Sequence, residues 1–282
     1  MDKENLKESL QHGTTAFPIA IYHNNFEKHQ HMLAHLHYHN EFELLVATKG
    51  TLCVQIEENS YTLPQGDGLF INSGLLHNIS AQDLCEHGFI AIVFDYTMLC
   101  SPHETSYSKY IYPLINRTLD IPVLLPKEIC TTVLSLYSMY KSTTFGSELY
   151  IKQCLLQIMY ILIKNAHSVP ASAHNSKSLI IKEALKFIKD NYATPISLQQ
   201  LANQAHVSKE YLCRIFHTHS DSSPMEYLNY YRIRQSTFLL LQTNKSISEI
   251  ALSCGFNHSS YYGKLFLQYM GCTPTEYRKN YR

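Results

Sequence analysis

The hydrophobic positions of this chain follow one period in its first third and another after it. Up to residue 98, short apolar runs are separated by turn residues, with turns predicted at Glu58-Asn59-Ser60 and Gln65-Gly66-Asp67-Gly68. Many short strands separated by glycine turns indicate a sandwich or a barrel. The run 89–94 is apolar throughout, as expected of a strand buried on both faces. The strands are predicted at 42–47, 53–56, 61–63, 69–71 and 89–94.

From about residue 105 the spacing of apolar residues becomes that of helices. It predicts one helix at 129–140 and a second at 148–165. The second helix carries a broad apolar stripe, which indicates packing against the chain's own barrel together with a subunit interface, and hence a homodimer. The stripe consists of positions 151, 155, 158, 159 and 162.

The last hundred residues contain the same helix-turn-helix pattern twice. One copy begins at Ser197 and the other at Ser246, and each serine is followed three residues later by Gln or Glu. This spacing is a capping box, in which the two side chains satisfy the free N–H groups of the first helical turn. Between the copies, 224–241 predicts a continuous helix of about 25 Å. Such a rod could hold two recognition helices near the ~34 Å repeat of the major groove.

The net charge of zero conceals a difference between the two ends of the chain. Residues 177–282 hold 13 Lys and Arg against 7 Asp and Glu, whereas the preceding part holds 10 against 16. The C-terminal part is therefore basic by +6, which favours binding to phosphate. The eight cysteines are scattered, the start of the chain has no apolar signal region, and no apolar stretch is long enough to cross a bilayer. These features predict a cytoplasmic protein without a membrane partner.

The second copy contains a specific order of residues. It runs Ile247-Ser248-Glu249-Ile250-Ala251, then Gly255-Phe256, Ser260-Tyr261-Tyr262 and Gly271-x-Thr273-Pro274. This order resembles the signature of AraC/XylS-type transcription regulators, and the resemblance covers residues 178–282. One departure is Leu267-Gln268, where the family usually carries basic residues.

The resemblance implies that the second helix of each copy enters the major groove of DNA. Arg214 then suits guanine or phosphate, and Glu210 can accept a hydrogen bond from cytosine. The second copy has shorter side chains, which favour phosphate contacts. Arg232 and Arg234 of the connecting helix either bind phosphate or pair with acidic neighbours. The positions that match the reading face are Lys209, Glu210, Cys213 and Arg214 in the first copy and His258, Ser259, Ser260, Gly263 and Lys264 in the second.

The N-terminal third carries a second resemblance. His37-x-His39-x-x-x-Glu43, followed by Gly50, resembles the first motif of the cupin barrel. The second motif is present as Gly66, Gly74 and His77, with Asn72 where that family usually has Pro.

The cupin resemblance points to four clustered side chains. Residues two apart on a strand point to the same face, so His37 and His39 face inward, as does Glu43 if the strand is unbroken. With His77 from a neighbouring strand they form a set suited to a divalent transition ion. The alternative is that they bind a polar effector or one another, because sensor barrels joined to AraC-type modules commonly take organic effectors without metal.

The predicted fold is α+β and multidomain, with a cupin-like β-barrel followed by an all-α module. The predicted domains are an effector-binding and dimerisation domain at 1–167, a linker at 168–177 and a double helix-turn-helix domain at 178–282. The predicted function is an effector-responsive transcription regulator, with double-stranded DNA, a small molecule such as a sugar and, for an activator, RNA polymerase as partners. The alternative is a metal-dependent cupin enzyme with an accessory helical domain.

Overall fold

The computed structural model describes residues 12–26, 32–83, 85–142, 144–169, 176–220 and 222–281. The chain divides into two compact units, Met1–His174 and Asn175–Arg282, which are described separately. Among the described residues, none of the helices combines the length and the apolar character that a membrane span needs.

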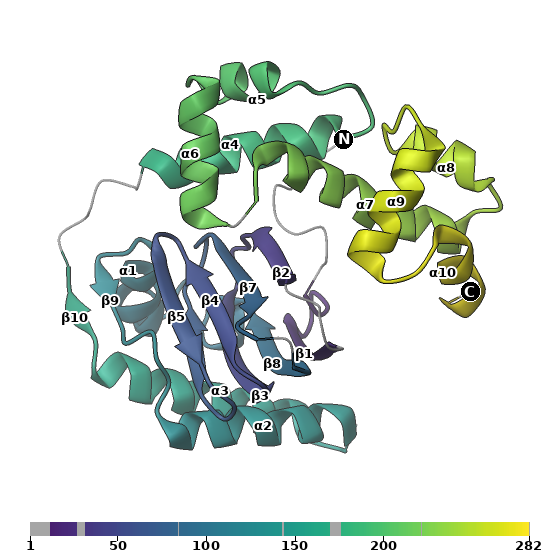
Figure 1. Cartoon of the computed structure of the whole chain (residues 1–282). Coiled ribbons are helices and arrows are strands. Elements are labelled where there is room, and N and C mark those ends of the chain that lie inside the picture. The colour runs from purple at the N-terminus through teal and green to yellow at the C-terminus, as the bar shows by residue number, and fades with distance from the viewer. Residues whose placement is uncertain are drawn as a thin grey trace. The chain divides into compact units, whose positions relative to one another are not determined.

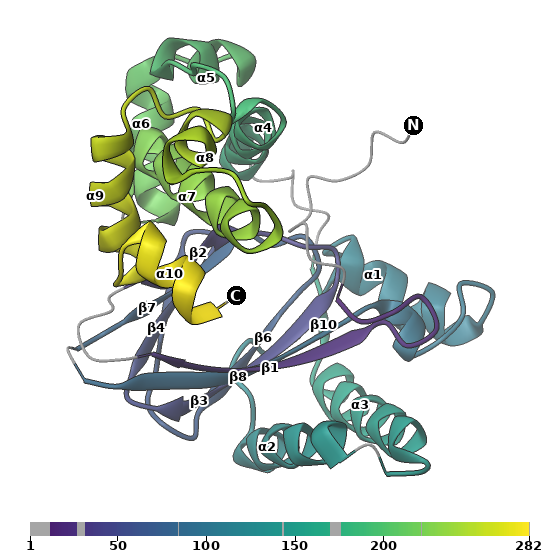
Figure 2. The same cartoon turned by 90° about the vertical axis from the view of Figure 1, so that its right-hand side faces the viewer.

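The N-terminal unit is built on two antiparallel four-stranded sheets (Figures 1 and 2). The strand order is β1-β8-β3-β6 in the first sheet and β2-β7-β4-β5 in the second. The five strands expected from the sequence are confirmed to within two residues at each end. The strands of the two sheets are β1 (Ile19–Phe26), β2 (Met32–His37), β3 (Phe42–Lys49), β4 (Leu52–Ile56), β5 (Asn59–Leu63), β6 (Gly68–Ile71), β7 (His77–Ala81) and β8 (His87–Phe94).

The hairpin between β4 and β5 turns earlier than the sequence suggests. Asn59 already pairs with Ile56, so the turn consists of Glu57 and Glu58. The predicted hairpin is confirmed, but of the residues expected in its turn, 58–60, only Glu58 lies there. Glu57 has a φ of 52°, the left-handed conformation that two-residue hairpin turns require. Asn and Ser are common turn residues, but here the sheet register places Asn59 and Ser60 in the strand.

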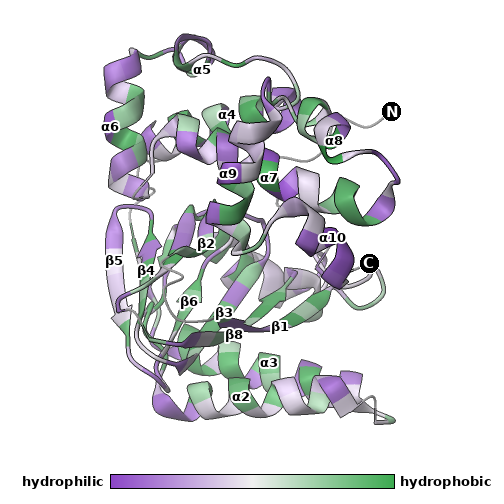
Figure 3. Cartoon of the chain, turned by 45° about the vertical axis from the view of Figure 1, so that its right-hand side comes forward, coloured by the Kyte–Doolittle hydropathy of each residue, from purple (hydrophilic) through white to green (hydrophobic). Residues whose placement is uncertain are grey.

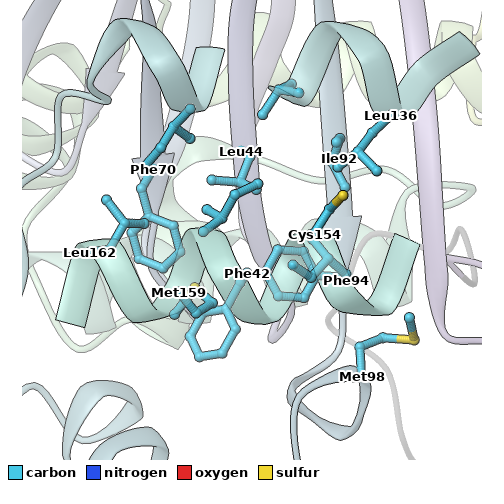
Figure 4. Packing of buried hydrophobic residues seen from close by; sticks show 14 of the residues in the cluster. Phe42, Leu44, Phe70, Ile92, Phe94, Met98, Leu136, Cys154, Met159 and Leu162 are labelled. Atoms are coloured by element: carbon cyan, nitrogen blue, oxygen red, sulfur yellow. The ribbon is translucent and has the colours of Figure 1, made fainter. Parts of the chain in front are cut away.

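Two helices cover the outer face of the first sheet, α2 (Lys127–Ser142) and α3 (Ser147–Lys164). Side chains alternate along β3, so Leu44 packs toward these helices while Leu45 faces the space between the sheets. Figure 4 shows Phe42, Leu44 and Phe94 of the sheet against Cys154 and Met159 of α3. Hydrophobic stretches, drawn in green, accordingly run along several of the strands and along α2 and α3 (Figure 3).

The predicted stripe on α3 is buried inside the unit. All five of its residues are at most 3% exposed, and they pack in the core formed with the sheet and α2. The prediction of packing against the barrel is confirmed, and these five residues cannot also form a subunit interface. Different apolar residues of α3 reach the surface, with Leu149 75%, Leu156 44% and Tyr160 66% exposed.

A short two-stranded sheet closes the N-terminal unit. His167 pairs with Asp120 and Ser168 with Leu119, so Ser168, expected at the start of the linker, lies in a strand. The remaining elements of this unit are η1 (Tyr96–Met98), η2 (Tyr107–Ile111), α1 (Tyr112–Ile115), β9 (Leu119–Asp120) and β10 (His167–Ser168).

The C-terminal unit is helical throughout its regular structure and contains both predicted helix-turn-helix pairs. The capping boxes at Ser197 and Ser246 are confirmed, and Ser223 with Glu226 forms a third at the start of α7. In α7, Pro224 lies at the first position, where its missing N–H removes no helical bond. The helices are α4 (Ser176–Asn191), α5 (Leu198–Gln204), α6 (Lys209–His219), α7 (Pro224–Gln242), α8 (Ile247–Ser253), α9 (Ser259–Met270) and α10 (Pro274–Tyr281).

Candidate functional site

The first candidate site is the N-terminal part of α6. Lys209, Glu210 and Arg214 are exposed there, and Cys213 is half-buried. The helix starts at Ser208, whose hydroxyl accepts a hydrogen bond from the Tyr211 N–H at 3.2 Å. The four reading-face residues at 209, 210, 213 and 214 are spaced one and four positions apart, and therefore project from one side of the helix.

Two contacts hold the charged side chains of α6 in place. The Arg214 guanidinium lies 5.0 Å from the centre of the Tyr211 ring, which places a cation over an aromatic face. The Glu210 carboxylate has a pKa below its ordinary value, because it accepts hydrogen bonds from its own backbone N–H and from Ser208. Glu210 therefore remains ionised beside Lys209.

The start of α9 repeats this arrangement fifty positions later. Ser259, Ser260 and Lys264 are exposed, and His258 is the N-cap residue, without a side-chain capping bond. Gly263 corresponds to Cys213, and a Cβ built on it would meet nothing within 4 Å. The matching side of α9 is therefore flatter than that of α6.

Arg232 has neither of the two roles expected for it. It is 8% exposed, and it donates from Nε to the Tyr192 carbonyl and from Nη2 to the Thr194 carbonyl, both at 2.8 Å. Its guanidinium also lies 5.8 Å from the Phe256 ring centre. Arg232 thus ties the end of α4 to α7 and to the turn of the second helix-turn-helix. Arg234, two residues along, is exposed.

The second candidate site brings together all four predicted barrel residues. The nearest Glu43 oxygen, Oε2, lies 3.1 Å from His39 Nε2 and 3.3 Å from His77 Nε2. The ring centres of His37 and His77 are 4.1 Å apart, and one ring nitrogen from each of His37, His39 and His77 lies within 4.8 Å of the others. We call His37, His39, Glu43 and His77 the His–Glu cluster.

The reason predicted for this convergence is only partly correct. The strand is not unbroken, because β2 ends at His37 and Glu43 lies in β3 of the other sheet, with His39 in the loop between them. His37 and His77 are register partners on neighbouring strands. The His–Glu cluster therefore joins the two sheets at one end of the space between them.

Backbone carbonyls fix the orientation of the three imidazole rings. His37 Nδ1 lies 2.7 Å from the His35 carbonyl, His77 Nδ1 2.9 Å from the Leu75 carbonyl, and His39 Nδ1 3.2 Å from the Glu41 carbonyl. A carbonyl oxygen can only accept, so each Nδ1 carries the hydrogen. In a neutral ring the Nε2 atom then presents a lone pair, the orientation that metal-binding histidines adopt.

The carboxylate of the His–Glu cluster is ionised. Burial alone would raise the pKa of Glu43, but its polar contacts with His39 and His77 and their charges outweigh burial and hold the pKa below the ordinary range. A buried carboxylate beside imidazole nitrogens needs protons or a cation between them. His77 Nε2 is itself buried, and it makes no hydrogen bond of good geometry within the described residues.

Sequence reasoning missed two features at this end of the barrel. His12 is buried, and its Nδ1 shares a hydrogen bond of 2.9 Å with the Tyr22 hydroxyl. The ring centres of His12 and His39 are 5.4 Å apart. A cavity of about 450 Å³ also lies close to the His–Glu cluster, since Leu75, whose carbonyl contacts His77, is part of its wall. The cavity is lined by Ile56, Phe70, Asn72, Leu75, Arg117, Leu119, Asp120, Ile121, Val123 and Val169.

Comparison with known proteins matches a stretch of each unit to a known domain family. Residues 201–280 match a family described as a helix-turn-helix domain, and residues 18–87 match the AraC-like ligand binding domain. The HTH-type transcriptional regulator YdeC of Bacillus subtilis is 29% identical over 98% of this chain and 97% of its own length. The chain belongs to the AraC-type transcription regulators.

Two further similarities fit this AraC-type chain. The lactose operon transcription activator of Staphylococcus xylosus is 25% identical over 78% of this chain and 83% of its own length. The structure of apo ToxT from Vibrio cholerae has the same fold, with a TM-score of 0.50 at 14% identity over 96% of this chain and 99% of that one. The matched domains and relatives are those of a transcription regulator, so the alternative of a metal-dependent cupin enzyme is wrong.

Proposed function

We propose that this AraC-type regulator reads specific DNA through α6 and α9 and that a small molecule bound in its N-terminal unit controls the reading. The observation that supports the DNA contact is the repeated geometry of the two helices. The exposed positions 209, 210 and 214 of α6 recur at 259, 260 and 264 of α9, each set following an N-cap residue. The cytoplasm, where the DNA lies, is the expected location.

The two helices are proposed to contact DNA differently. Arg214 has the planar fork of donors that pairs with guanine or phosphate, and Lys209 adds a charge for the backbone. Ser259, Ser260 and Gly263 offer little reach into a groove, so α9 relies on Lys264 and on phosphate contacts. Base specificity is therefore expected to come mainly from the α6 side of the site.

The test begins with selection of binding sites from random DNA by the full chain. Arg214→Ala is expected to cost about 1–3 kcal/mol and to relax the preference at one base pair. Lys264→Ala is expected to weaken binding evenly across sequences and to lower the salt dependence. Lys141→Ala, at an exposed lysine of α2 in the N-terminal unit, serves as a control outside the DNA-binding unit. Failure to select any sequence, or an Arg214→Ala variant that binds like the control, would contradict the proposal.

The effector is proposed to be a small organic molecule. The names of relatives such as the lactose operon activator suggest a carbohydrate. The lining of the cavity is mainly apolar, which suits a ligand less polar than a sugar. Both classes therefore belong in the ligand screen. Whether the protein activates, and so contacts RNA polymerase, follows from the position of its DNA site relative to a promoter.

The His–Glu cluster fits a divalent transition ion. His37, His39 and His77 would supply Nε2 ligands and Glu43 a carboxylate oxygen, and the carbonyl bonds at each Nδ1 already orient the rings. Such an ion would balance the buried carboxylate and hold the two sheets together. The test is metal content after purification, with a rise in the unfolding midpoint on adding Zn²⁺ or Mn²⁺ that His77→Ala abolishes. A metal-free protein that no divalent ion stabilises would exclude it.

The protein is proposed to form a homodimer through the exposed side of α3. Phe145, just before the helix, and Leu149, Leu156 and Tyr160 on it follow helical spacing and form one exposed apolar stripe. Leu156 and Tyr160 also line a hollow of about 350 Å³ against η2. A second copy of α3 would bury this stripe as coiled helices do.

Two substitutions in α3 test the dimer. Leu156→Asp places a charge on the stripe and is expected to yield a folded monomer in sedimentation. Ile158→Asp, two residues along, is expected to unfold the unit instead, because Ile158 is 1% exposed in the core. Wild-type protein that sediments as a monomer, or a Leu156→Asp protein that still dimerises, would exclude this interface.

A further inference from the structure

The cavity beside the His–Glu cluster has the composition of a binding site for an amphipathic molecule. Seven of its ten lining residues are apolar, and the polar ones are Asn72, Arg117 and Asp120. Its volume of about 450 Å³ falls in the usual range for small-molecule sites. None of the four residues of the His–Glu cluster lines it, so the cavity is a separate site.

Arg117 is the member of this lining with unused hydrogen-bonding capacity. Its Nη2 makes two long contacts, 3.4 Å to the Gly74 carbonyl and 3.5 Å to Glu57 Oε1. Its Nη1 and Nε donors have no partner among the described residues. Arg117 also has a φ of 57°, and a non-glycine residue held in the left-handed region is a common feature of ligand sites.

The other two polar residues are occupied with the backbone or placed at the rim. Asn72 donates to the Leu114 carbonyl at 2.8 Å and accepts from the Ser73 N–H at 2.8 Å. Asp120 accepts from the Ile121 N–H at 3.0 Å and is exposed. Glu57 and Asp120 are both acidic, so a ligand with two negative charges would be repelled. A single carboxylate can instead displace the long contact of Arg117 with Glu57 and form the two parallel bonds that guanidinium favours.

The cavity also contacts the segment that leads to the DNA-binding unit. Leu119 of β9 and Val169, which directly follows β10, both line it. Val169 is attached there by its N–H, which donates to the Thr118 carbonyl at 3.0 Å, and β10 pairs with β9 over two residues. A ligand packed against both Leu119 and Val169 would bind the paired arrangement better than an unpaired one, which is the condition for control by an effector.

We propose that this cavity is the effector site, that its ligand is an organic monocarboxylate with an apolar body, and that the ligand acts by stabilising the pairing of β10 with β9. The carboxylate binds Arg117, and the apolar part packs against Leu119 and Val169. This inference rests on the proposed function, because it names the effector class and the site of that same regulator.

The test measures binding of octanoate and phenylacetate to the full chain by calorimetry, with octanamide, phenylacetamide and lactose as neutral comparisons. At least one carboxylate is expected to bind and its amide to bind much more weakly. Arg117→Gln is expected to weaken carboxylate binding about 10- to 100-fold, the usual effect of losing a charge-assisted hydrogen-bonded pair. Glu57→Gln removes the competing carboxylate and is expected to tighten binding several-fold. Lys141→Gln, at an exposed lysine of α2, is the matched control and is expected to have no effect.

Several results would overturn this assignment. They are the absence of carboxylate binding, tighter binding of lactose than of either acid, and binding that persists in Arg117→Gln but is lost in His77→Ala. If Arg117→Gln does not fold, Glu57→Gln decides, and binding no tighter than wild type overturns the proposal.

A second measurement separates this inference from the proposed function. Fluorescence anisotropy reports the affinity of the full chain for its selected DNA with and without the bound acid. If no carboxylate alters the affinity for DNA, the effector assignment is overturned, whereas the proposed function as a DNA-binding regulator is not contradicted. A chain that selects no DNA contradicts the proposed function, whereas loss of carboxylate binding in Arg117→Gln would still support the ligand site.

Discussion

Replacing Arg232 by Met is expected to destabilise the C-terminal unit by about 3 kcal/mol. The substitution removes both hydrogen bonds to the Tyr192 and Thr194 carbonyls and leaves those carbonyls without a strong donor. Hydrogen bonds from a charged group contribute about 1.5–3 kcal/mol each, and the cation over Phe256 adds about 0.5–1 kcal/mol. Burial lowers the pKa of Arg232, so desolvation of the charge offsets part of this sum. We therefore take the lower end of the range for each hydrogen bond.

The assay is thermal unfolding of the full chain followed by circular dichroism. A loss of about 3 kcal/mol corresponds to a fall of roughly 15 °C in the midpoint of a unit of about one hundred residues. Arg234→Met is the matched control, because Arg234 is exposed and lies two residues away on the same helix. This control is expected to change stability by less than about 0.5 kcal/mol.

The same variants test whether Arg232 fixes the two helix-turn-helix units relative to each other. Arg232→Met protein, measured below its midpoint, is expected to lose affinity for the complete DNA site more than for a half site that α6 alone can read. Midpoints of the two variants within about 2 °C of each other would refute the stability argument. Equal loss on complete and half sites would refute the orienting role.

The remaining predictions concern backbone conformation and helix capping. Gly255→Ala is expected to cost about 2–4 kcal/mol in urea unfolding, because Gly255 has a φ of 82° and a Cβ there would lie 2.5 Å from the Tyr192 carbonyl oxygen. Gly263→Ala is expected to stabilise the same unit by about 0.5–1 kcal/mol, since nothing lies within 4 Å of the new methyl group in helix α9. Acid is expected to lower the unfolding midpoint of the C-terminal unit, because backbone N–H bonds from Ser223 and Ser246 hold the pKa of Glu226 and Glu249 below the ordinary 4.5. Stabilisation by a carboxyl whose pKa is lower in the folded state is present above its unfolded pKa and is lost as the pH falls, so the decline should begin near pH 4.5 and be smaller in Glu249→Gln.

Features set by neighbouring residues could be predicted from the sequence. The capping boxes at Ser197 and Ser246 follow from a three-residue spacing, and α7 begins at Pro224 and ends within one residue of its expected end. Short apolar runs bounded by turn residues likewise located β3 and the other four expected strands. These features depend on contacts within one turn of helix or one strand, which a single sequence displays.

Features set by distant contacts could not be predicted in the same way. Glu57 rather than Asn59 makes the hairpin turn, because the register of β4 with β7 and of β5 with β4 places Asn59 in strand β5. β2 and β3 belong to different sheets, although only four residues separate them in the sequence. The His–Glu cluster was still predicted, because its residue types and their spacing match the cupin motif whether or not the strand between them is continuous. The cavity was not, because Arg117 reaches it from a segment whose sequence shows no periodic pattern.

The difference between α6 and α9 has a consequence for genes under the control of this protein. One chain carries an arginine-bearing reader and a flatter one in a fixed order, so its proposed DNA site has two unlike halves. Such a site has a direction, unlike a palindrome, and it can be placed in either orientation before a gene. If the DNA site were inverted, the opposite end of the bound protein would face the start of transcription. The effect on transcription is therefore expected to differ between the two orientations, although every base pair of the site is the same.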